Sequence, residues 1–255
     1  MTTQSASRSV RTRPAASLPQ PQLDWAYFFD VDGTLADIEQ LPEDVRIRTR
    51  VRATIDRLYD ATGGAVALVS GRTVVDIDRL YPGSKMPLSG QHGVEWRNAT
   101  GLRVSPTHDM RLLDRVRAAL SDAVSRSPGL MLQDKGYSLA LHYRQAPHMA
   151  AYAHHLMRAA QATLGSDFAV MRGKRIVEIK PAFSNKGTAV AQLMTIPAFA
   201  GRIPVFVGDD ITDEYGFSAV NEMHGISVKI GTGPTVANWR LRDITELMTW
   251  LSRVP

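Results

Sequence analysis

Hydrophobic and polar positions divide this chain into two kinds of segment. Several short runs are apolar throughout, and the first two are followed by patterns with apolar residues every three or four positions. Apolar strands that alternate with helices are typical of a parallel sheet covered on both faces. We therefore predict an α/β fold. The apolar runs are Trp25–Phe29, Ala65–Val69, Ile203–Val207 and Ser227–Ile230, and the helical patterns lie near Asp44–Tyr59 and Val74–Leu80.

The middle of the chain has a different pattern of hydrophobic and polar residues. Residues Gly136–Arg144 alternate, with Leu139 and Leu141 on one face, and Arg175–Lys180 alternates again. Between them, Met149–Leu164 has the period of an amphipathic helix. This predicts a smaller half-buried sheet with helices on one side, inserted into the parallel core. The predicted division is a disordered basic tail at 1–22, a core at 23–107 and 178–255, and an α+β cap at 108–177.

Composition restricts the chemistry that the chain can perform. The 255 residues are 44% hydrophobic, which is enough for well-developed cores, and contain no cysteine. Disulfides and cysteine-based metal sites are therefore excluded, and any metal must bind to carboxylates or imidazoles. No apolar run is long enough to span a membrane.

The net charge of +5 is concentrated near the N-terminus. Arg8, Arg11 and Arg13 precede the first acid, Asp24, and without these three charges +2 remains, too little for a nucleic-acid footprint. The acid-free, Ser- and Arg-bearing composition of this tail also overlaps that of organellar transit peptides. The default expectation is a cytoplasmic protein, a monomer or weak oligomer, that binds neither membrane nor nucleic acid.

The segment Asp30–Leu35 (DVDGTL) carries the main candidate chemistry. It follows an apolar run, so Asp30 and Asp32 lie at a strand's carboxyl end, where parallel sheets bind ligands. Aspartate can attack phosphorus as a nucleophile, and a second carboxylate can act as acid and base. Gly33 permits a tight turn, and the Thr34 hydroxyl can donate to a phosphate oxygen. The alternative interpretation is an ordinary Asp-Gly turn after a strand.

Two further segments place polar groups at strand or helix ends. Ser70-Gly71-Arg72 follows the second apolar run, although Ser70 could simply cap a helix. Ser184-Asn185-Lys186-Gly187 opens a helical pattern, where a lysine opposes the helix dipole. Lys186 would therefore neutralise a phosphate or a carboxylate there, unless it is merely exposed.

The segment Gly208–Glu214 (GDDITDE) crowds four carboxylates into one turn from strand to helix. Asp213 and Glu214 are explained by helix capping alone. Asp209 and Asp210 are not, because they lie at the strand end and would repel each other without a hard cation such as Mg²⁺.

In this order, DVDGTL, SGR, NKG and GDDITDE resemble the signatures of the haloacid-dehalogenase-like (HAD) phosphohydrolase superfamily. Five further segments and the extended PVFVGDD run narrow the resemblance to trehalose-6-phosphate phosphatases of the bacterial OtsB type. The resemblance covers the chain from about residue 24 to its end. The five segments are Gly90–Gly93 (GQHG), Ala140–Arg144 (ALHYR), Gly173-Lys174, Val177–Pro181 (VEIKP) and Val228–Gly231 (VKIG).

The resemblance implies a Rossmann-like core that hydrolyses trehalose 6-phosphate with Mg²⁺, the final step of trehalose biosynthesis. Asp30 would be the nucleophile that forms an aspartyl-phosphate, and Asp32 the acid/base. Ser70 and Lys186 would hold the phosphoryl oxygens. The metal would be held by Asp30, the backbone carbonyl of Asp32, and Asp209, with Asp210 and Asp213 close by.

The inserted cap would supply the sugar contacts. Lys174 and Glu178 are four residues apart in an alternating segment, so we expect both on one face, about 13 Å apart. In the resembling family these two positions are understood to contact the sugar. The other candidates have an equally plain structural explanation, as solvent-facing or turn residues. They are Arg72, Gln91, His92, Gly93, Lys135, His142, Arg144 and Arg172.

Three alternatives stay open from the sequence. The chain could hydrolyse another sugar phosphate, such as sucrose phosphate, glucosyl-phosphoglycerate or a monosaccharide phosphate. It could be a phosphoacceptor signalling domain, although those are about half this length. A silent sugar-phosphate sensor would not need the Asp30/Asp32 pair.

Overall fold

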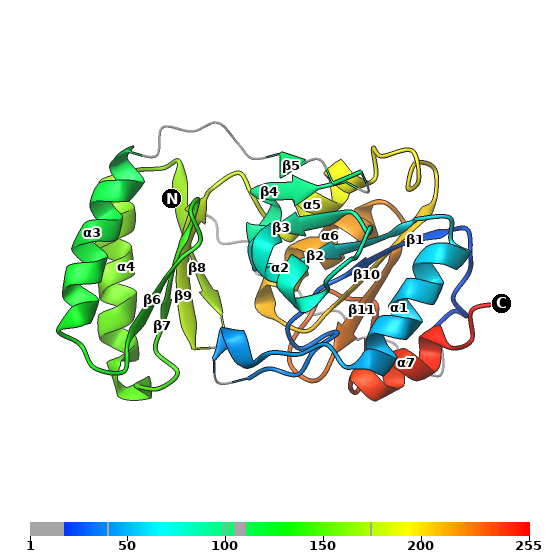
Figure 1. Cartoon of the computed structure of the whole chain (residues 1–255), viewed down its shortest axis with the longest axis horizontal. Helices are drawn as coiled ribbons and strands as arrows, with labels where there is room; N and C mark the ends of the chain where they lie inside the picture. The colour runs from blue at the N-terminus through cyan, green and yellow to red at the C-terminus, as the bar shows by residue number, and fades with distance from the viewer. Residues whose placement is uncertain (1–17, 40, 99, 102, 105–110, 174) are drawn as a thin grey trace. The chain divides into compact units, whose positions relative to one another are not determined.

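The computed structural model describes residues 18–39, 41–98, 100–101, 103–104, 111–173 and 175–255. The chain divides into two compact units (Figure 1). The first unit contains residues up to 38, 45–69 and 186–255, and the second contains residues 39–44 and 70–185. Among the described helices, every one falls short of the length and apolarity needed to cross a membrane.

The first unit is a parallel sheet between two layers of helices, as predicted. The strand order is β12-β11-β10-β1-β2, and all neighbours are parallel. Helices α5 and α6 pack on one face, and α1 packs with α7 on the other (Figure 1). The strands are β1 (Trp25–Phe29), β2 (Val66–Val69), β10 (Ile203–Gly208), β11 (Ile226–Ile230) and β12 (Trp239–Leu241). The helices are α1 (Thr49–Ala61), α5 (Lys186–Leu193), α6 (Glu214–Glu222) and α7 (Ile244–Leu251), with a 3-10 turn η5 (Ile211–Asp213).

Strand β1 shows why its sequence is apolar throughout. Phe28 stacks on Phe199 on the α5 side, with ring centroids 5.4 Å apart. Tyr27 points the other way, to Trp250 of α7, at 6.5 Å. Both faces of the strand are therefore buried, and alternation is lost from the sequence.

The second unit contains a part with short antiparallel strands and a separate small sheet. The first part contains α2 (Val74–Leu80), β3 (Leu88–Gly90), η3 (Gln91–Gly93), β4 (Glu95–Arg97) and β5 (Arg103–Val104), with β4 antiparallel to both other strands. The small sheet has the order β6-β7-β9-β8, all antiparallel, with α3 and α4 on one face (Figure 1). Its elements are α3 (Arg111–Ser125), β6 (Met131–Asp134), β7 (Leu139–His142), η4 (Pro147–Met149), α4 (Ala150–Leu164), β8 (Phe168–Gly173) and β9 (Ile176–Pro181).

The small sheet confirms the predicted alternation. Leu139 and Leu141 of β7 join Val177 and Ile179 of β9 in one core with the two helices. Glu178 lies between Val177 and Ile179 and pairs in register with Ala140, so both belong to the face away from the helices.

Two expectations about local structure were wrong. The first helix begins at Thr49 rather than near Asp44, because Pro42–Asp44 form a short 3-10 turn and Arg48 is extended. The predicted tail ended at residue 22, yet residues 18–22 pack on the first unit. Leu18 is buried, and the Pro19 carbonyl accepts from Trp250 Nε1 at 2.8 Å. Residues 1–17 lie outside the described residues.

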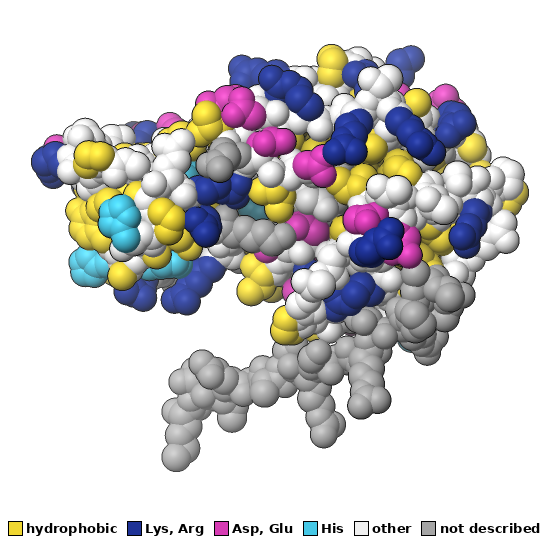
Figure 2. Space-filling view, turned by 90° about the horizontal axis from the view of Figure 1, so that it is seen from below, with side chains coloured by type: hydrophobic (Ala, Val, Ile, Leu, Met, Phe, Trp, Pro, Cys, Tyr) yellow, Lys and Arg dark blue, Asp and Glu magenta, His cyan; other side chains and the backbone are white. Residues whose placement is uncertain are grey.

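On the face shown in Figure 2, Lys and Arg side chains are interspersed with Asp and Glu. This mixture fits the small net charge that remains once the N-terminal arginines are set aside.

Candidate functional site

Strand register brings the acidic segments of the first unit together. Phe29 of β1 pairs with Val207 of β10, and the Asp30 N–H donates to the Val207 carbonyl at 3.0 Å. The two parallel strands therefore end side by side, and Asp30 and Asp209 leave the sheet at the same edge. This is the edge at which the sequence predicted them.

Lys186 is buried between two carboxylates. Its Nζ donates to Asp30 Oδ1 and to Asp213 Oδ1, both at 2.6 Å, and the lysine is only 2% exposed. The alternative of an exposed lysine is therefore wrong. Burial would lower the pKa of Lys186, but the two carboxylates raise it above its ordinary value.

Asp30 lies in a strongly acidic environment. Burial raises its pKa well above the ordinary value, Lys186 opposes this, and Asp213, Asp209 and Asp32 raise it further. One lysine thus faces several acids, so a further positive charge in the site would be electrostatically favourable.

Asp213 has a second role besides the helix capping that its position suggested. It is fully buried, and its Oδ2 accepts the N–H groups of Asp209 and Asp210 at 2.8 Å each. Asp210 is the N-cap of η5 and forms a capping box with Asp213. The capping interpretation of Asp213 is therefore confirmed, but it is incomplete, because the other carboxylate oxygen accepts from Lys186.

Two glycines make space for these acids. A Cβ on Gly208 would come closer than 3.0 Å to the Asp213 carboxylate, and one on Gly33 would do the same to Asp209. Gly33 also has φ +87°, which other residues rarely adopt. Both turns are therefore restricted to glycine by the carboxylates beside them.

Three carboxylates could hold a metal ion. Oxygens of Asp30, Asp209 and Asp213 all lie within 4.8 Å of one another. An all-oxygen set of this kind suits a hard cation such as Mg²⁺. Among the described residues the grouped carboxylates do not include Asp32 or Asp210, which are half-buried nearby in sequence.

Thr34 and Lys229 of the first unit are also buried, and of these Thr34 was a candidate from the sequence but Lys229 was not. Lys229, at the end of β11, is 4% exposed and donates to the Asp209 carbonyl at 2.6 Å. Its position at a strand end, inside the quoted VKIG segment, was the only available signal. The Thr34 hydroxyl is fully buried and has no hydrogen-bond partner among the described residues.

Ser70 and Arg72 belong to the second unit. Ser70 is fully buried, and its Oγ accepts the Arg72 N–H at 3.2 Å. The residue that caps α2 is Thr73, which accepts from Asp76 N at 3.0 Å, so the helix-cap alternative for Ser70 is wrong. The Arg72 guanidinium donates to the Pro42 carbonyl at 3.0 Å.

The GQHG segment forms a strained, buried turn. Gln91, His92 and Gly93 all have positive φ, at +47°, +58° and +102°. Gln91 and His92 are 1% and 5% exposed. A Cβ on Gly71 would clash with the His92 ring, so this close approach requires glycine.

Glu178 is the centre of a buried polar cluster in the second unit. Lys135 Nζ lies 3.0 Å from its Oε2, Ser138 Oγ 2.8 Å from its Oε1, and His92 Nε2 3.6 Å from its Oε2. Burial alone would raise the pKa of Glu178, but Lys135 and His92 hold it below the ordinary range. Lys135 is therefore not a solvent-facing residue. Ser138 was missed, because a lone serine just before a strand has no recognisable signal.

The remaining sugar-site candidates, His142, Arg144 and Arg172, bond to residues other than Glu178 or face solvent. Nε2 of His142 is 2.9 Å from Gln133 Oε1, and burial, with Lys135 nearby, lowers the pKa of His142 to about 4. Arg144 donates to the Glu39 carbonyl, and Arg172 is exposed on β8.

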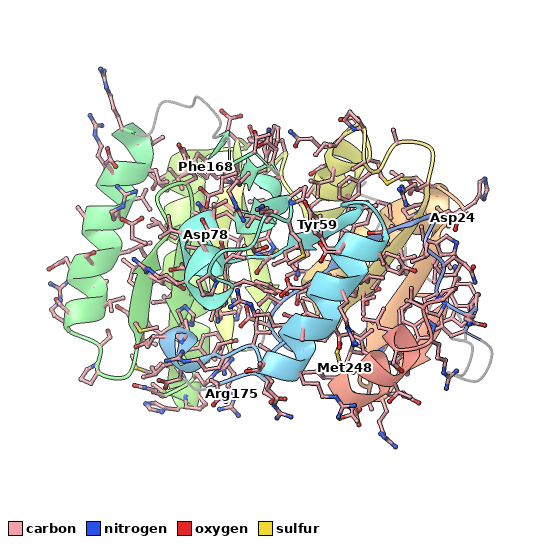
Figure 3. All side chains as sticks on the ribbon, turned by 45° about the vertical axis from the view of Figure 1, so that its right-hand side comes forward. Asp24, Tyr59, Asp78, Phe168, Arg175 and Met248 are labelled. Carbon is pink, nitrogen blue, oxygen red and sulfur yellow. The ribbon has the colours of Figure 1, made fainter. Side chains whose placement is uncertain are left out.

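The expected separation of Lys174 and Glu178 stays a prediction, but the strand that contains Glu178 begins later than expected from the sequence. Lys174 itself lies outside the described residues. Strand β9 begins only at Ile176, and Arg175 has φ +64°, so the regular rise cannot extend back from Glu178 past Ile176. Figure 3 shows Arg175 and Phe168 at opposite ends of the β8–β9 hairpin.

Comparison with known proteins identifies the family. The profile of a family described as trehalose-phosphatase matches residues 28–245. The chain belongs to the trehalose-phosphatase family. It is 41% identical to the trehalose-6-phosphate phosphatase of Escherichia coli (strain K12), over 95% of this chain and 91% of that protein. The C-terminal domain of the trehalose-6-phosphate phosphatase of Candida albicans superposes with a TM-score of 0.80 at 25% identity, covering 91% of each chain.

A more distant structure confirms the predicted fold class. A phosphatase of the HAD superfamily from Bacteroides thetaiotaomicron covers 89% of this chain and 93% of its own, with a TM-score of 0.62. At 13% identity this likeness shows the fold alone. The chain is thus a HAD-fold member of a phosphatase family, with the small antiparallel sheet expected of a cap.

Proposed function

We propose that this protein hydrolyses trehalose 6-phosphate to trehalose and phosphate through an aspartyl-phosphate on Asp30, the last step of trehalose biosynthesis. Membership of the trehalose-phosphatase family supports the substrate. The observation that carries the reaction is the buried arrangement in which Lys186 contacts both Asp30 and Asp213 at 2.6 Å. A phosphoacceptor signalling domain or a silent sensor does not fit this family.

In the first step the Asp30 carboxylate attacks phosphorus, and the bond from phosphorus to the sugar oxygen breaks. Asp32 protonates that leaving oxygen, and trehalose departs. Water then attacks the aspartyl-phosphate while Asp32 takes its proton, which releases phosphate and restores Asp30. Because Lys186 fixes Asp30 Oδ1, the nucleophile enters the reaction already oriented.

Mg²⁺ fits this site because the clustered donors of Asp30, Asp209 and Asp213 are all oxygens. These residues, with the Asp32 carbonyl and nearby Asp210, would hold it, and it would neutralise charge on the phosphoryl oxygens. Lys186 and the partnerless Thr34 hydroxyl would donate to the same oxygens. Ser70 stays in the proposal as a phosphoryl donor on the sequence resemblance alone.

Sugar recognition is proposed for the second unit. Glu178 supplies a charged acceptor, Lys135 and His92 lie against its carboxylate, and Gln91 meets it through Ser138. Gly93, His142 and Arg144 stay in the proposal on the sequence resemblance. Arg72, Arg172 and Lys174 stay in the proposal on the sequence alone. A cytoplasmic monomer or weak oligomer likewise remains a proposal, which light scattering and cell fractionation would test.

A phosphate-release screen over sugar phosphates with Mg²⁺ tests the substrate. We expect strong preference for trehalose 6-phosphate and many turnovers per chain. Preference for sucrose phosphate, glucosyl-phosphoglycerate or a monosaccharide phosphate would overturn the substrate. Asp30→Asn should abolish turnover without unfolding the protein, and substantial residual kcat would refute the nucleophile. Chelation with EDTA should stop turnover and added Mg²⁺ restore it.

A further inference from the structure

A four-residue turn delivers two separate groups to the Glu178 carboxylate. Lys135 and Ser138 occupy its ends, Lys135 N donates to the Ser138 carbonyl at 3.0 Å, and Gly136 has φ +85°. Lys135 reaches Oε2 of Glu178 at 3.0 Å, and Ser138 reaches Oε1 at 2.8 Å. Each carboxylate oxygen is therefore fixed by a different end of the same turn.

The Ser138 hydroxyl has a second neighbour besides Glu178, and it cannot donate to both. Its Oγ also lies 2.9 Å from Oε1 of Gln91, yet a hydroxyl has one proton to donate. Glu178 has none to offer, because Lys135 and His92 keep it ionised despite its burial. Ser138 must therefore donate to Glu178, since an ionised acceptor takes the stronger hydrogen bond.

That assignment leaves a lone pair of Ser138 facing the amide of Gln91. Ser138, Gln91 and Glu178 are 0%, 1% and 3% exposed, so water cannot supply the missing donor cheaply. Two oxygens facing each other without a proton between them would be unfavourable in this buried position. The NH₂ group of an amide has nearly the same shape as its oxygen, and it would satisfy the lone pair.

We infer that Gln91 turns its Nε2 toward Ser138, so that Gln91 donates to Ser138, Ser138 donates to Glu178, and both act as positioning residues for sugar recognition by Glu178. This rests on the proposed function of Glu178 as a sugar contact. Among the described residues, no hydrogen bond holds the Gln91 amide in the opposite orientation.

The backbone of the GQHG turn supports a positioning role. Gln91 and His92 adopt φ +47° and +58°, a conformation that non-glycine residues rarely adopt. Such conformations persist where the surroundings require them, often at binding sites. Here they place one side chain on Ser138, 47 residues away in sequence, and the other on the still more distant Glu178.

The chain of hydrogen bonds from Gln91 through Ser138 to Glu178 also fixes the orientation of the Glu178 carboxylate. With one donor on each oxygen, the carboxylate cannot rotate, and its remaining lone pairs keep constant directions for ligand hydroxyls. Removal of the Ser138 donor would free that rotation, while Asp30 and Lys186 belong to the other unit. The expected defect is therefore in sugar binding rather than in phosphoryl transfer.

The test compares Ser138→Ala and Gln91→Met, which keeps nearly the length and volume of glutamine but has no group that can donate. We would measure kcat and KM for trehalose 6-phosphate and for p-nitrophenyl phosphate, together with thermal unfolding. Each variant should raise the KM for trehalose 6-phosphate about tenfold, the usual effect of a lost hydrogen bond to a charged group. The kcat and KM for p-nitrophenyl phosphate should each change less than twofold.

Ser127→Ala is the matched control. Ser127 is also buried in the second unit, but its hydroxyl donates to the Ala123 carbonyl, so both KM values should stay unchanged. The double variant Ser138→Ala/Gln91→Met should be no worse than the more affected single variant, because both substitutions break the same chain of hydrogen bonds.

An unchanged KM for trehalose 6-phosphate in Gln91→Met, or equal losses on both substrates, would overturn the inference. If Ser138→Ala does not fold, Gln91→Met alone decides. A wild-type protein that does not hydrolyse trehalose 6-phosphate would instead refute the proposed function, so the two failures are distinguishable.

Discussion

The substitution Lys186→Met removes the charge that two buried carboxylates share while keeping the side chain's volume. Lys186 lies 2.6 Å from Asp30 and from Asp213, and all three residues are less than 5% exposed. At an effective dielectric constant of about 20, each contact gives roughly 6 kcal/mol of Coulomb attraction, offset in part by desolvation. Removing one partner of such a buried cluster typically costs about 3–5 kcal/mol.

We therefore expect Lys186→Met to lower the melting temperature by about 10 °C and to reduce kcat at least a hundredfold. Urea unfolding in EDTA, which removes any bound metal, would measure the stability, and phosphate release would measure kcat. Lys85→Met, at an exposed lysine of the second unit, is the control and should change neither.

The pH dependence gives this prediction a direction. Lys186 lowers the pKa of Asp30, so its removal raises that pKa further. A carboxylate whose pKa is higher in the folded state than in the unfolded state destabilises the folded protein. This penalty is absent below the unfolded-state pKa, about 3.9, grows as the pH rises above it, and is complete above the folded-state pKa. The loss should thus be largest at pH 7 and smaller near pH 4. A loss below about 1 kcal/mol at pH 7, or a retained kcat, would refute Lys186 as the buried counter-charge.

Three further predictions test other residues. Asp32→Asn should reduce kcat for the sugar substrate by about 10²–10⁴-fold but affect p-nitrophenyl phosphate, with its better leaving group, much less; equal losses would contradict the acid role. Gly33→Ala should reduce both stability and kcat, since φ +87° is strained for alanine and the new Cβ would meet the Asp209 carboxylate; full activity would contradict this. Because Lys135 and His92 depress the pKa of Glu178, this group's stabilisation is present above its unfolded pKa of about 4.3 and is lost as the pH falls toward the folded pKa. The urea-unfolding free energy of Glu178→Gln should therefore fall less steeply than that of wild type between pH 5 and 2.5, and parallel curves would argue against the pair.

Strand-end chemistry was predictable because it depends on local pattern. An apolar run ended by Asp30 specifies a buried strand with an acid at its carboxyl end, and the same holds for Asp209 after β10. Parallel register then brings the two ends together, as Phe29 opposite Val207 shows. The predicted α/β fold was confirmed for the same reason.

Roles that depend on side-chain direction were not predictable. Asp213 has the position of a helix cap, and only the packed turn shows its carboxylate facing Lys186 rather than solvent. The interval from Lys174 to Glu178 alternates like a strand, but positive φ at Arg175 interrupts it. Alternation in sequence cannot reveal a turn that one non-glycine residue makes.

By itself, the sequence determined the parallel core, the acids at its edge and the phosphatase family, since periodicity and local motifs encode these directly. Tertiary structure alone decided which groups share protons. Glu178 meets Lys135 and Ser138 across 43 and 40 residues, and Lys186 meets Asp30 across 156. The physical reason is burial: ionisation and hydrogen bonding inside the protein are set by whichever groups packing places within about 3 Å, whatever their distance along the chain.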